Sequence, residues 1–323
     1  MKYTRLGSTG LRVSRLALGC MSYGDPNTPG AHQWALHEGD ARPYFWQAVE
    51  LGITFWDTAN SYQAGTSEEV VGRAITRYSR REDIVLATKV FGTMHPGPGG
   101  SGLSRKAILE QVDASLSRLG TDYIDLYQIH RFDPNTPVEE TMEALHDIVK
   151  AGKVRYLGAS SMYGWQFGKL QHAADLGGWT RFVSMQNQYN LLRRQDEPEL
   201  MALCADQGVG LVPYSPQGKC RLARPWGEQS LRSTVDKVVK AFDSDHDEPV
   251  VNEVQRIADA RGVTMAQVAL AWVLTNPIVS APIVGATKPH HLSEAVEALD
   301  LTLTEEEVTA SEAPYVNSGP SWF

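Results

Sequence analysis

The sequence has few cysteines and no long hydrophobic run. Its 323 residues include three cysteines, Cys20, Cys204 and Cys220, and no CxxC pair. Such a set suits neither a disulfide framework nor a zinc site, so we expect a reducing compartment and no metal. No apolar run reaches the roughly 18 residues that a membrane-spanning helix needs, and the polar start MKYTRLGSTG is unlike a signal peptide. We therefore expect a cytoplasmic globular protein that does not engage a membrane.

Positive charge and phosphate-binding glycine motifs are also scarce. Lys and Arg total 30 against 38 for Asp and Glu, which gives a net charge of -8 and argues against a nucleic-acid partner. No GxGxxG loop follows an early strand, which disfavours a doubly wound open sheet. No Pro/Ser-rich linker divides the chain, so we predict one domain over residues 1–323. The sequence leaves the oligomeric state open.

Short β-branched apolar runs alternate with stretches of helical periodicity. Parallel strands need helical crossovers and eight such strands close a barrel, so this alternation predicts a (β/α)8 TIM barrel. An N-terminal β-hairpin, Lys2–Leu6 with Leu11–Ser14, should precede it. The eight predicted strands are Arg15–Leu18, Ile53–Trp56, Ile84–Thr88, Tyr123–Ile129, Val154–Gly158, Phe182–Gln186, Val209–Pro213 and Ala281–Val284.

Two polar insertions interrupt this alternation. Asp25–Arg42 follows the first predicted strand, and Gln217–Glu248 follows the seventh. Loops that follow strands lie on the catalytic face of a barrel, so we expect both to be long loops that act as lids. Two plain surface loops are the alternative.

Ionisable residues stand at the ends of three successive predicted strands. Asp57, Lys89 and His130 each directly follow an apolar run, and Tyr62 lies five residues beyond Asp57. We expect Lys89 and His130 to lower the pKa of the Tyr62 phenol and Asp57 to pair with Lys89. A phenol so placed can protonate an alkoxide as it forms, which carbonyl reduction by hydride requires. A Schiff-base role for Lys89, as in barrel aldolases, is the competing interpretation.

At this point the sequence resembles a known family, the aldo-keto reductase superfamily. The resemblance covers nearly the whole chain and is most similar to a bacterial branch related to aryl-alcohol dehydrogenases and to potassium-channel β subunits. It rests on residues 52–62 and 67–72, Ala87-Thr88-Lys89-Val90, Asp125-Leu126-Tyr127-Gln128-Ile129-His130, Gln186-Asn187-Gln188-Tyr189-Asn190 and Pro213-Tyr214-Ser215-Pro216.

The resemblance implies an NADPH-dependent oxidoreductase that reduces an aldehyde or ketone to an alcohol. It makes Tyr62 the proton donor, with Asp57, Lys89 and His130 as the other catalytic residues. A cofactor-bound redox-sensing module with slow turnover, as in the channel β subunits, is the alternative function. The implied cofactor contacts are Gly19, Cys20, Met21 and Asp57 near the ring, Ser160, Ser161, Gln186 and Tyr214 around the nicotinamide, Ser215, Gln217 and Lys219 along the pyrophosphate, and Gly285, Thr287, Lys288, His291 and Glu294 at the adenosine.

The adenosine end also has support from the residues themselves. A helix N-terminus after Thr287 offers free N–H groups to an anion, and Lys288 adds a charge suited to a 2′-phosphate. The sequence therefore favours NADPH over NADH, although Thr287 as a simple cap beside a solvated Lys288 is the alternative. Ser161, Cys220 and Ala295 depart from the family pattern, in which asparagine, glycine and asparagine are common, and these departures concern cofactor affinity.

Substrate recognition is expected from residues in strand-following loops. The candidates are Tyr23, Phe91, Arg131, Phe132 and Trp226, whose aromatic rings suit an apolar or aromatic carbonyl compound. The planar fork of Arg131 suits an acidic substrate group. A salt bridge of Arg131 with Asp133 or another loop carboxylate is the alternative.

Overall fold

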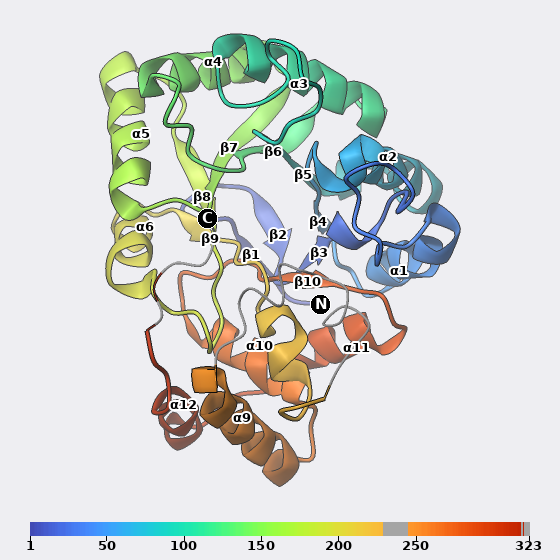
Figure 1. The fold of residues 1–323 in the computed structure, drawn as a ribbon, viewed down its shortest axis with the longest axis vertical. Coiled ribbons are helices and arrows are strands. Elements are labelled where there is room, and N and C mark those ends of the chain that lie inside the picture. Colours follow the sequence, from blue (N-terminus) through green and yellow to red (C-terminus); the bar gives the residue numbers. More distant parts are fainter. Residues whose placement is uncertain (229–244, 318, 320–323) are drawn as a thin grey trace.

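The computed structural model describes residues 1–228, 245–317 and 319 and shows a parallel sheet curled into a barrel with helices around it (Figure 1). The eight strands lie in the order β10-β3-β4-β5-β6-β7-β8-β9, and every neighbouring pair is parallel. The predicted TIM barrel is therefore confirmed. The strands are β3 Ala17–Gly19, β4 Phe55–Asp57, β5 Val85–Val90, β6 Ile124–Ile129, β7 Val154–Ser160, β8 Phe182–Gln186, β9 Gly210–Leu211 and β10 Ile283–Gly285.

Backbone hydrogen bonds join β9 to the segment that leads into β10 and so bring the two ends of the sheet together. Leu211 N donates to Ile278 O at 3.0 Å, and Ser280 N donates to Leu211 O at 2.8 Å. The predicted hairpin is also present, as antiparallel β1 (Tyr3–Arg5) and β2 (Arg12–Ser14).

Each crossover between neighbouring strands carries at least one helix on the outside of the barrel. Glycine ends α3 as expected, because Gly120 adopts the left-handed φ of 62° that closes a helix. The helices are α1 Glu38–Glu50, α2 Thr66–Tyr78, α3 Arg105–Leu119, α4 Val138–Lys150, α5 Gly164–Gly177, α6 Ala202–Asp206, α9 Glu248–Arg261, α10 Met265–Thr275, α11 His290–Glu297 and α12 Glu305–Glu312. Among the described helices no single one has the length and apolar character to cross a membrane; α9 and α10 pass that test only as a pair bent by 104°.

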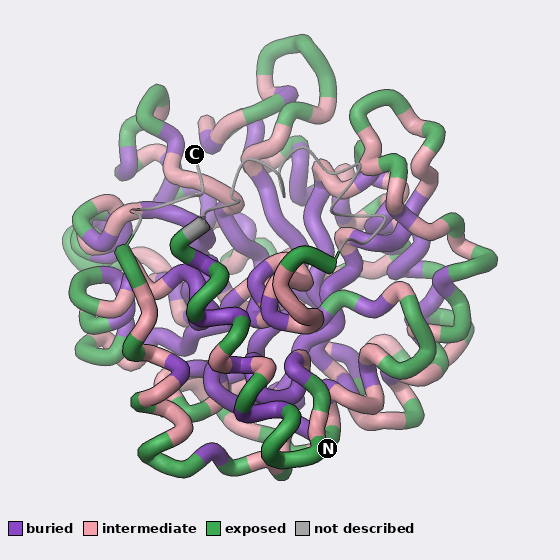
Figure 2. The backbone as a smooth tube through the Cα atoms, turned by 60° about the horizontal axis from the view of Figure 1, so that its bottom comes forward, coloured by how far each residue is buried: buried purple, intermediate pink, exposed green. Residues whose placement is uncertain are grey.

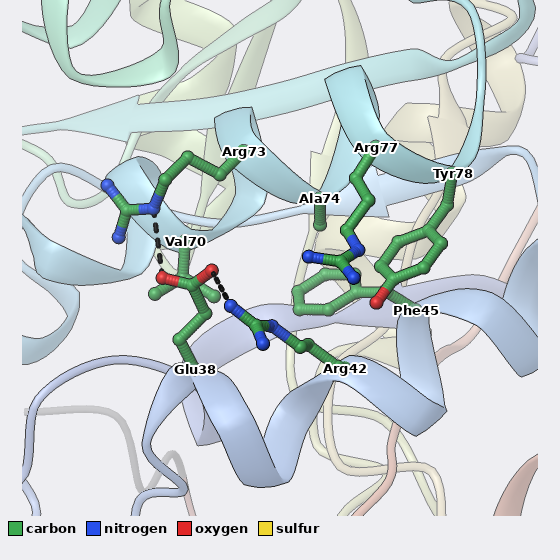
Figure 3. A pocket seen from close by; sticks show the side chains of 8 residues that line it. All are labelled: Glu38, Arg42, Phe45, Val70, Arg73, Ala74, Arg77 and Tyr78. Carbon is green, nitrogen blue, oxygen red and sulfur yellow. Dashed lines mark hydrogen bonds and ion pairs between the residues drawn. The ribbon is translucent and has the colours of Figure 1, made fainter.

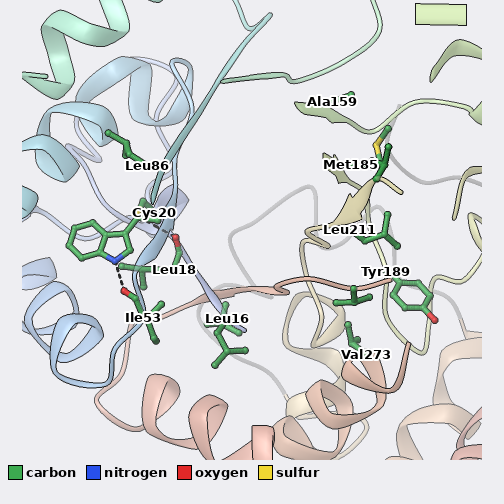
Figure 4. Close-up of a cluster of buried hydrophobic side chains, with 14 of the residues drawn as sticks. Leu16, Leu18, Cys20, Ile53, Leu86, Ala159, Met185, Tyr189, Leu211 and Val273 are labelled. Atoms are coloured by element: carbon green, nitrogen blue, oxygen red, sulfur yellow. Dashed lines mark hydrogen bonds between the residues drawn. The ribbon is translucent and has the colours of Figure 1, made fainter. Parts of the chain in front are cut away.

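The core has two layers because successive side chains of a strand point to opposite faces. Leu16 and Leu18 point outward into the large cluster between strands and helices, part of which Figure 4 shows. Ala17 points inward, where it packs with Phe55, Leu126 and the hairpin residues Leu6 and Val13. The hairpin thus closes the amino-terminal end of the barrel, and the strands run through its most buried region (Figure 2).

The two insertions are only partly the loops that the sequence predicted. Glu38–Arg42 forms the start of α1, so the first loop ends at His37. That loop is tied down: Gly24 N donates to Leu36 O at 3.0 Å, and Leu36 N donates to Ser22 O at 2.8 Å. The second insertion begins with the short helix η5 (Gly218–Ala223), and its residues 229–244 lie outside the described chain. A lid role stays a prediction for both.

Candidate active site

Four polar side chains meet inside the barrel at the carboxyl ends of β4, β5, β6 and β8, namely Asp57, Lys89, Gln128 and Gln186. We call this end of the barrel the barrel mouth. Strands β4 and β5 end one and two residues later than predicted, so Asp57 is the last residue of β4 and Lys89 lies within β5, while β6 ends as predicted and His130 follows it. The register explains the meeting. Asp57 pairs with Ala87, two residues before Lys89, and Lys89 pairs with Gln128. Period-two alternation then turns all of these side chains to one face.

Lys89 is fully buried, and all three of its ammonium donors have partners. Its Nζ donates to Asp57 Oδ2 at 2.6 Å, to the Thr58 carbonyl at 2.8 Å and to the Tyr62 hydroxyl at 3.2 Å. Burial acts to lower the pKa of Lys89, but Asp57 and Tyr62 outweigh it, and the pKa is raised. Because a Schiff base needs a neutral amine, this environment argues against the aldolase interpretation.

Two glutamines hold the other oxygen of Asp57. Gln128 Nε2 and Gln186 Nε2 each donate to Asp57 Oδ1 at 2.9 Å, and Gln186 Nε2 also donates to Gln128 Oε1 at 3.2 Å. Both N–H groups of Gln186 are thus engaged by protein, which leaves its amide oxygen for the expected nicotinamide contact. Sequence reasoning missed Gln128 and this role of Gln186. The signal was available, since Gln128 stands two residues before His130 and shares its face.

The Tyr62 phenol lies beside His130, with ring centroids 5.6 Å apart and planes at 77°. Burial raises the pKa of Tyr62, and the opposing charge of Lys89 does not outweigh it. Burial, with the charges of Lys89 and Arg131, holds the pKa of His130 well below its ordinary value. Lys89 acts to lower the phenol pKa, as predicted, but burial outweighs it, so the expected net lowering is not found. His130 is neutral at neutral pH and Tyr62 keeps its proton.

The loop that carries Tyr62 is held from two sides. Gln63 is buried in a left-handed conformation (φ 49°); its Nε2 donates to Met21 O at 2.7 Å and its Oε1 accepts from His32 N at 2.7 Å. On the other side, a Cβ on Gly92 would lie 2.6 Å from Ser61 Cβ, so glycine is required for that approach. The Met21 carbonyl, which belongs to an expected cofactor contact, is thus already engaged by Gln63.

Among the predicted substrate residues, Tyr23 was wrong. Its side chain is fully buried, its hydroxyl donates to Ala286 O at 2.9 Å, and its ring packs on Phe45 with centroids 4.8 Å apart. Because helix α1 covers it, Tyr23 is a core residue. Phe91 directly follows β5, is half-buried and has a φ of 142°, a strained conformation of the kind that concentrates at functional sites.

Arg131 does not pair with Asp133, so that form of the alternative was wrong. Asp133 is buried, and its carboxylate accepts from Leu103 N at 2.8 Å, Asn135 N at 2.9 Å and Thr136 Oγ1 at 2.9 Å. These hydrogen bonds hold the loop backbone in place. Arg131 instead donates to the His130 carbonyl at 2.8 Å.

The two remaining aromatic candidates differ in their surroundings. Phe132 packs edge-on against Trp165, with centroids 5.9 Å apart. Trp226 lies beneath the Arg221 guanidinium, 4.8 Å from the ring centroid, just before the residues outside the description. Of the two, only Phe132 is near a catalytic candidate in sequence, two residues after His130.

The serines expected at the nicotinamide, Ser160 at the end of β7 and Ser161 directly after it, are nearly fully buried. Ser160 Oγ donates to Gln186 O at 2.8 Å, and Ser161, with a φ of 46°, donates to the Tyr214 hydroxyl at 3.4 Å. The Ser161 bond thus links Tyr214 to the end of β7. Cys20, by contrast, is the first residue of η1 (Cys20–Ser22), and its thiol is fully buried, so its side chain is part of the core. The Cys20 carbonyl accepts from Ser67 Oγ at 2.9 Å. Gly19 ends β3 and is also buried.

The loop expected along the pyrophosphate has a series of left-handed residues. Ser215, Gly218, Lys219 and Cys220 have φ values of 52°, 57°, 54° and 74°, and Gln217 caps η5. Backbone of this kind turns successive N–H groups toward a common side, as anion-binding loops do. Cys220, where the family commonly has glycine, occupies a conformation that favours glycine.

Positive charge collects at the expected adenosine end. Thr287 N donates to His291 Nδ1 at 3.3 Å, and burial with the charges of His290, Lys288 and Arg224 lowers the pKa of His291 to about 4. Lys288 is exposed and lies three residues after Gly285, the last residue of β10. Arg224 directly follows η5. Sequence reasoning missed Arg224, because only the fold brings its charge within electrostatic range of His291.

Other contacts at this end are settled within the protein. Glu294 Oε2 accepts from Thr264 Oγ1 at 3.4 Å, so its carboxylate already supports the start of α10. Ala295, a departure from the family pattern, is buried. The side chains of Lys288 and Arg224 have no hydrogen bond or ion pair to any residue that the structure describes, so the donor set fits a phosphate-bearing dinucleotide.

Comparisons with known proteins agree with this geometry. A profile described as "Aldo/keto reductase family" matches residues 15–315. The chain is 45% identical to the versiconal hemiacetal acetate reductase of Aspergillus parasiticus, covering 98% of this chain and 97% of that protein. It is 42% identical to the aldo-keto reductase AMT2 of Alternaria alternata, over 98% of this chain and 92% of that protein. It is 40% identical to a candidate aryl-alcohol dehydrogenase of Schizosaccharomyces pombe, over 97% and 95%.

These three relatives are fungal, so the expected placement in a bacterial branch has no support, whereas the likeness to aryl-alcohol dehydrogenases does. The match covers nearly the whole chain, from just after the hairpin to beyond α12. Together with the barrel, it establishes an oxidoreductase of a class that uses nicotinamide cofactors. The chain belongs to the aldo/keto reductase family.

Proposed function

We propose that the protein reduces an aldehyde or ketone to an alcohol with NADPH, with Tyr62 as the proton donor. One observation carries the proposal: the buried Lys89 ammonium joins Asp57 and the Tyr62 hydroxyl at the barrel mouth, at 2.6 and 3.2 Å. Carboxyl ends of barrel strands are where enzymes of this fold place their reactive groups.

Bound NADPH would supply the hydride; the chain's own residues handle the proton and the charge. Tyr62 keeps its proton until an alkoxide develops next to it and then donates from Oη. Lys89, held charged by Asp57, stabilises the phenolate that remains. Neutral His130 lies beside the same phenol and offers a ring N–H to the substrate oxygen, which orients the carbonyl group.

The choice of NADPH as cofactor rests mainly on two cationic side chains, Arg224 and Lys288. Ser160, Ser161 and Tyr214 would hold the nicotinamide end beside the mouth, and the left-handed loop of Ser215–Cys220 would follow the pyrophosphate. Arg224 and Lys288 would meet a 2′-phosphate, since each is a donor without a partner in the described chain. This arrangement supports NADPH over NADH.

The relatives support carbonyl and alcohol chemistry. One is named for reducing a hemiacetal acetate and another for oxidising aryl alcohols. Aryl aldehydes and ketones are therefore the first substrates to examine.

The test is NADPH oxidation by the purified protein with a panel of aldehydes and ketones, beside Tyr62→Phe. The variant should lose about 10²–10⁴-fold in kcat, as loss of a general acid does, with an unchanged Kd for NADPH. Tyr78→Phe on α2 is the matched control and should retain full turnover. NADPH binding without reduction of any carbonyl by the native protein would instead favour the redox-sensing module.

A further inference from the structure

Arg131 carries the uncompensated charge at the barrel mouth. Asp57 neutralises Lys89, and His130 is neutral. The only hydrogen bond of the Arg131 guanidinium to the described residues is the one from its NH1 to the His130 carbonyl. Its remaining donors are therefore available to a ligand, and the nearest acidic residue in sequence, Asp133, is buried and occupied by three other donors.

The charge of Arg131 acts on the reacting groups. It acts to lower the pKa values of Tyr62, His130 and Tyr214, although burial outweighs it for the two tyrosines, whose pKa values are raised. Arg131 directly follows His130, whose carbonyl it binds and whose ring lies 5.6 Å from that of Tyr62. It stands after β6, which is four strands from β10 and three from β9 in the sheet order, so it is across the ring from the loops expected to hold the cofactor phosphates.

An aromatic pair lies next to this charge. Phe132 follows Arg131 directly and is half-buried, and its ring meets that of Trp165, the second residue of α5, edge to face. Trp165 is 58% exposed, an unusual state for so large an apolar side chain. Exposed aromatic rings beside a site are typical of surfaces that receive another ring.

We propose that the substrate is an aromatic aldehyde or ketone that bears an anionic group, with Arg131 binding the anion and Trp165, beside Phe132, contacting the ring. This rests on the proposed reductase function and narrows its substrate class. The planar fork of Arg131 matches a carboxylate in a bidentate manner, so a carboxylate is the probe of choice.

The first experiment compares 3- and 4-carboxybenzaldehyde with their methyl esters as substrates of the native protein and of Arg131→Gln. The variant should lose at least about tenfold in kcat/KM for the acids and less than about twofold for the esters, since a charge-assisted hydrogen bond is lost only with the acids. Each compound is compared with itself, so differences in carbonyl reactivity cancel. Arg155→Gln, which removes an exposed arginine near the amino-terminal end of β7, is the matched control and should change neither ratio.

A binding measurement removes the dependence on turnover. Benzoate and benzamide are titrated into the protein saturated with NADP+, by calorimetry. Benzoate should bind at least about tenfold more tightly than benzamide, and Arg131→Gln should abolish that difference.

The aromatic contact is tested separately with Trp165→Ala. Its kcat/KM should fall several-fold for the carboxybenzaldehydes relative to hexanal, while Trp46→Ala, another exposed tryptophan on α1, should leave the ratio unchanged.

An equal loss for acids and esters in Arg131→Gln, or equal binding of benzoate and benzamide, would overturn the anion site. An equal loss for the carboxybenzaldehydes and hexanal in Trp165→Ala would overturn the ring contact. Absence of any carbonyl turnover, with Arg131-dependent benzoate binding retained, would overturn the reductase function and leave the anion site standing.

Discussion

Two clusters of ion pairs in this barrel use the same chemical groups in opposite environments. In the pocket between α1 and α2, Glu38 accepts from Arg42 at 3.2 Å and from Arg73 at 2.9 Å (Figure 3). Those arginine side chains are 46% and 54% exposed. At the barrel mouth the Lys89 and Asp57 side chains are 0% and 3% exposed. The N···O distances of the ion pairs are comparable in the two clusters, so the clusters differ mainly in their exposure to solvent.

That difference decides what each cluster can do. Water screens the Glu38 pairs and competes for their donors, so they contribute little to stability. The Lys89–Asp57 pair has been taken out of water, and each charge there depends on the other and on the hydrogen bonds from Gln128 and Gln186. Such a pair stabilises the fold weakly, yet it holds an ammonium group in one position beside Tyr62.

The strongest test of this contrast is Asp57→Ala. It leaves the buried ammonium of Lys89 without its carboxylate, so the free energy of unfolding should fall by about 3–5 kcal/mol in urea denaturation. The double variant Asp57→Ala with Lys89→Met should recover part of that loss, because no buried charge remains unpaired. A fall below about 1 kcal/mol in the single variant would contradict the account.

The half-exposed cations at the adenosine end should show an intermediate effect. Replacing Arg224 and Lys288 together by Gln should raise the Kd of NADPH at least about tenfold and change that of NADH less than about threefold. Fluorescence titration measures both, with Arg77→Gln on α2 as the control. Equal affinity of the native protein for NADPH and NADH would refute the phosphate site.

The pH dependence of stability tests the effect of partial burial on His291. Its folded pKa of about 4 lies below the ordinary value of about 6.5, so the unfolded chain binds more protons between these two pH values. The stabilising effect of the neutral ring is complete above about pH 6.5 and is lost as the pH falls toward 4. His291→Gln should reduce the drop in unfolding free energy between pH 7 and pH 4 by about 1 kcal/mol. His172→Gln, on the exposed side of α5, should not.

The exposed cluster should give the smallest effect. Glu38→Gln should change the unfolding free energy by less than about 0.5 kcal/mol and leave turnover unchanged. Any effect should shrink in 1 M salt, because mobile ions screen exposed charges. A loss as large as that of Asp57→Ala would mean that exposure does not separate the two clusters.

Sequence reasoning succeeded where the signal was local. Strand β8 begins and ends where predicted, and the other strands shift at one or both ends by one or two residues, because their limits depend on pairing with neighbours. Lys89 and Asp57 were correctly predicted to pair. That prediction needed only the strand order and the rule that carboxyl ends of parallel strands share one side of the barrel.

It failed where distant segments decide burial. Tyr23 follows a strand like a pocket residue, but α1 covers it. Asp133 is two residues from Arg131 and still points to the Leu103 backbone instead. The sequence did not predict that Arg224 acts on His291, because the two residues are far apart in the chain.

The sequence by itself determined which residues face the barrel mouth and in what order, since alternation along strands and turn chemistry act over a few residues. Only the tertiary structure decided their charge states. Desolvation of Tyr62 and His130 depends on atoms brought from every strand around them, and it reversed the expected direction of the tyrosine pKa. The same packing left the Arg131 guanidinium without an ion pair to any residue that the structure describes.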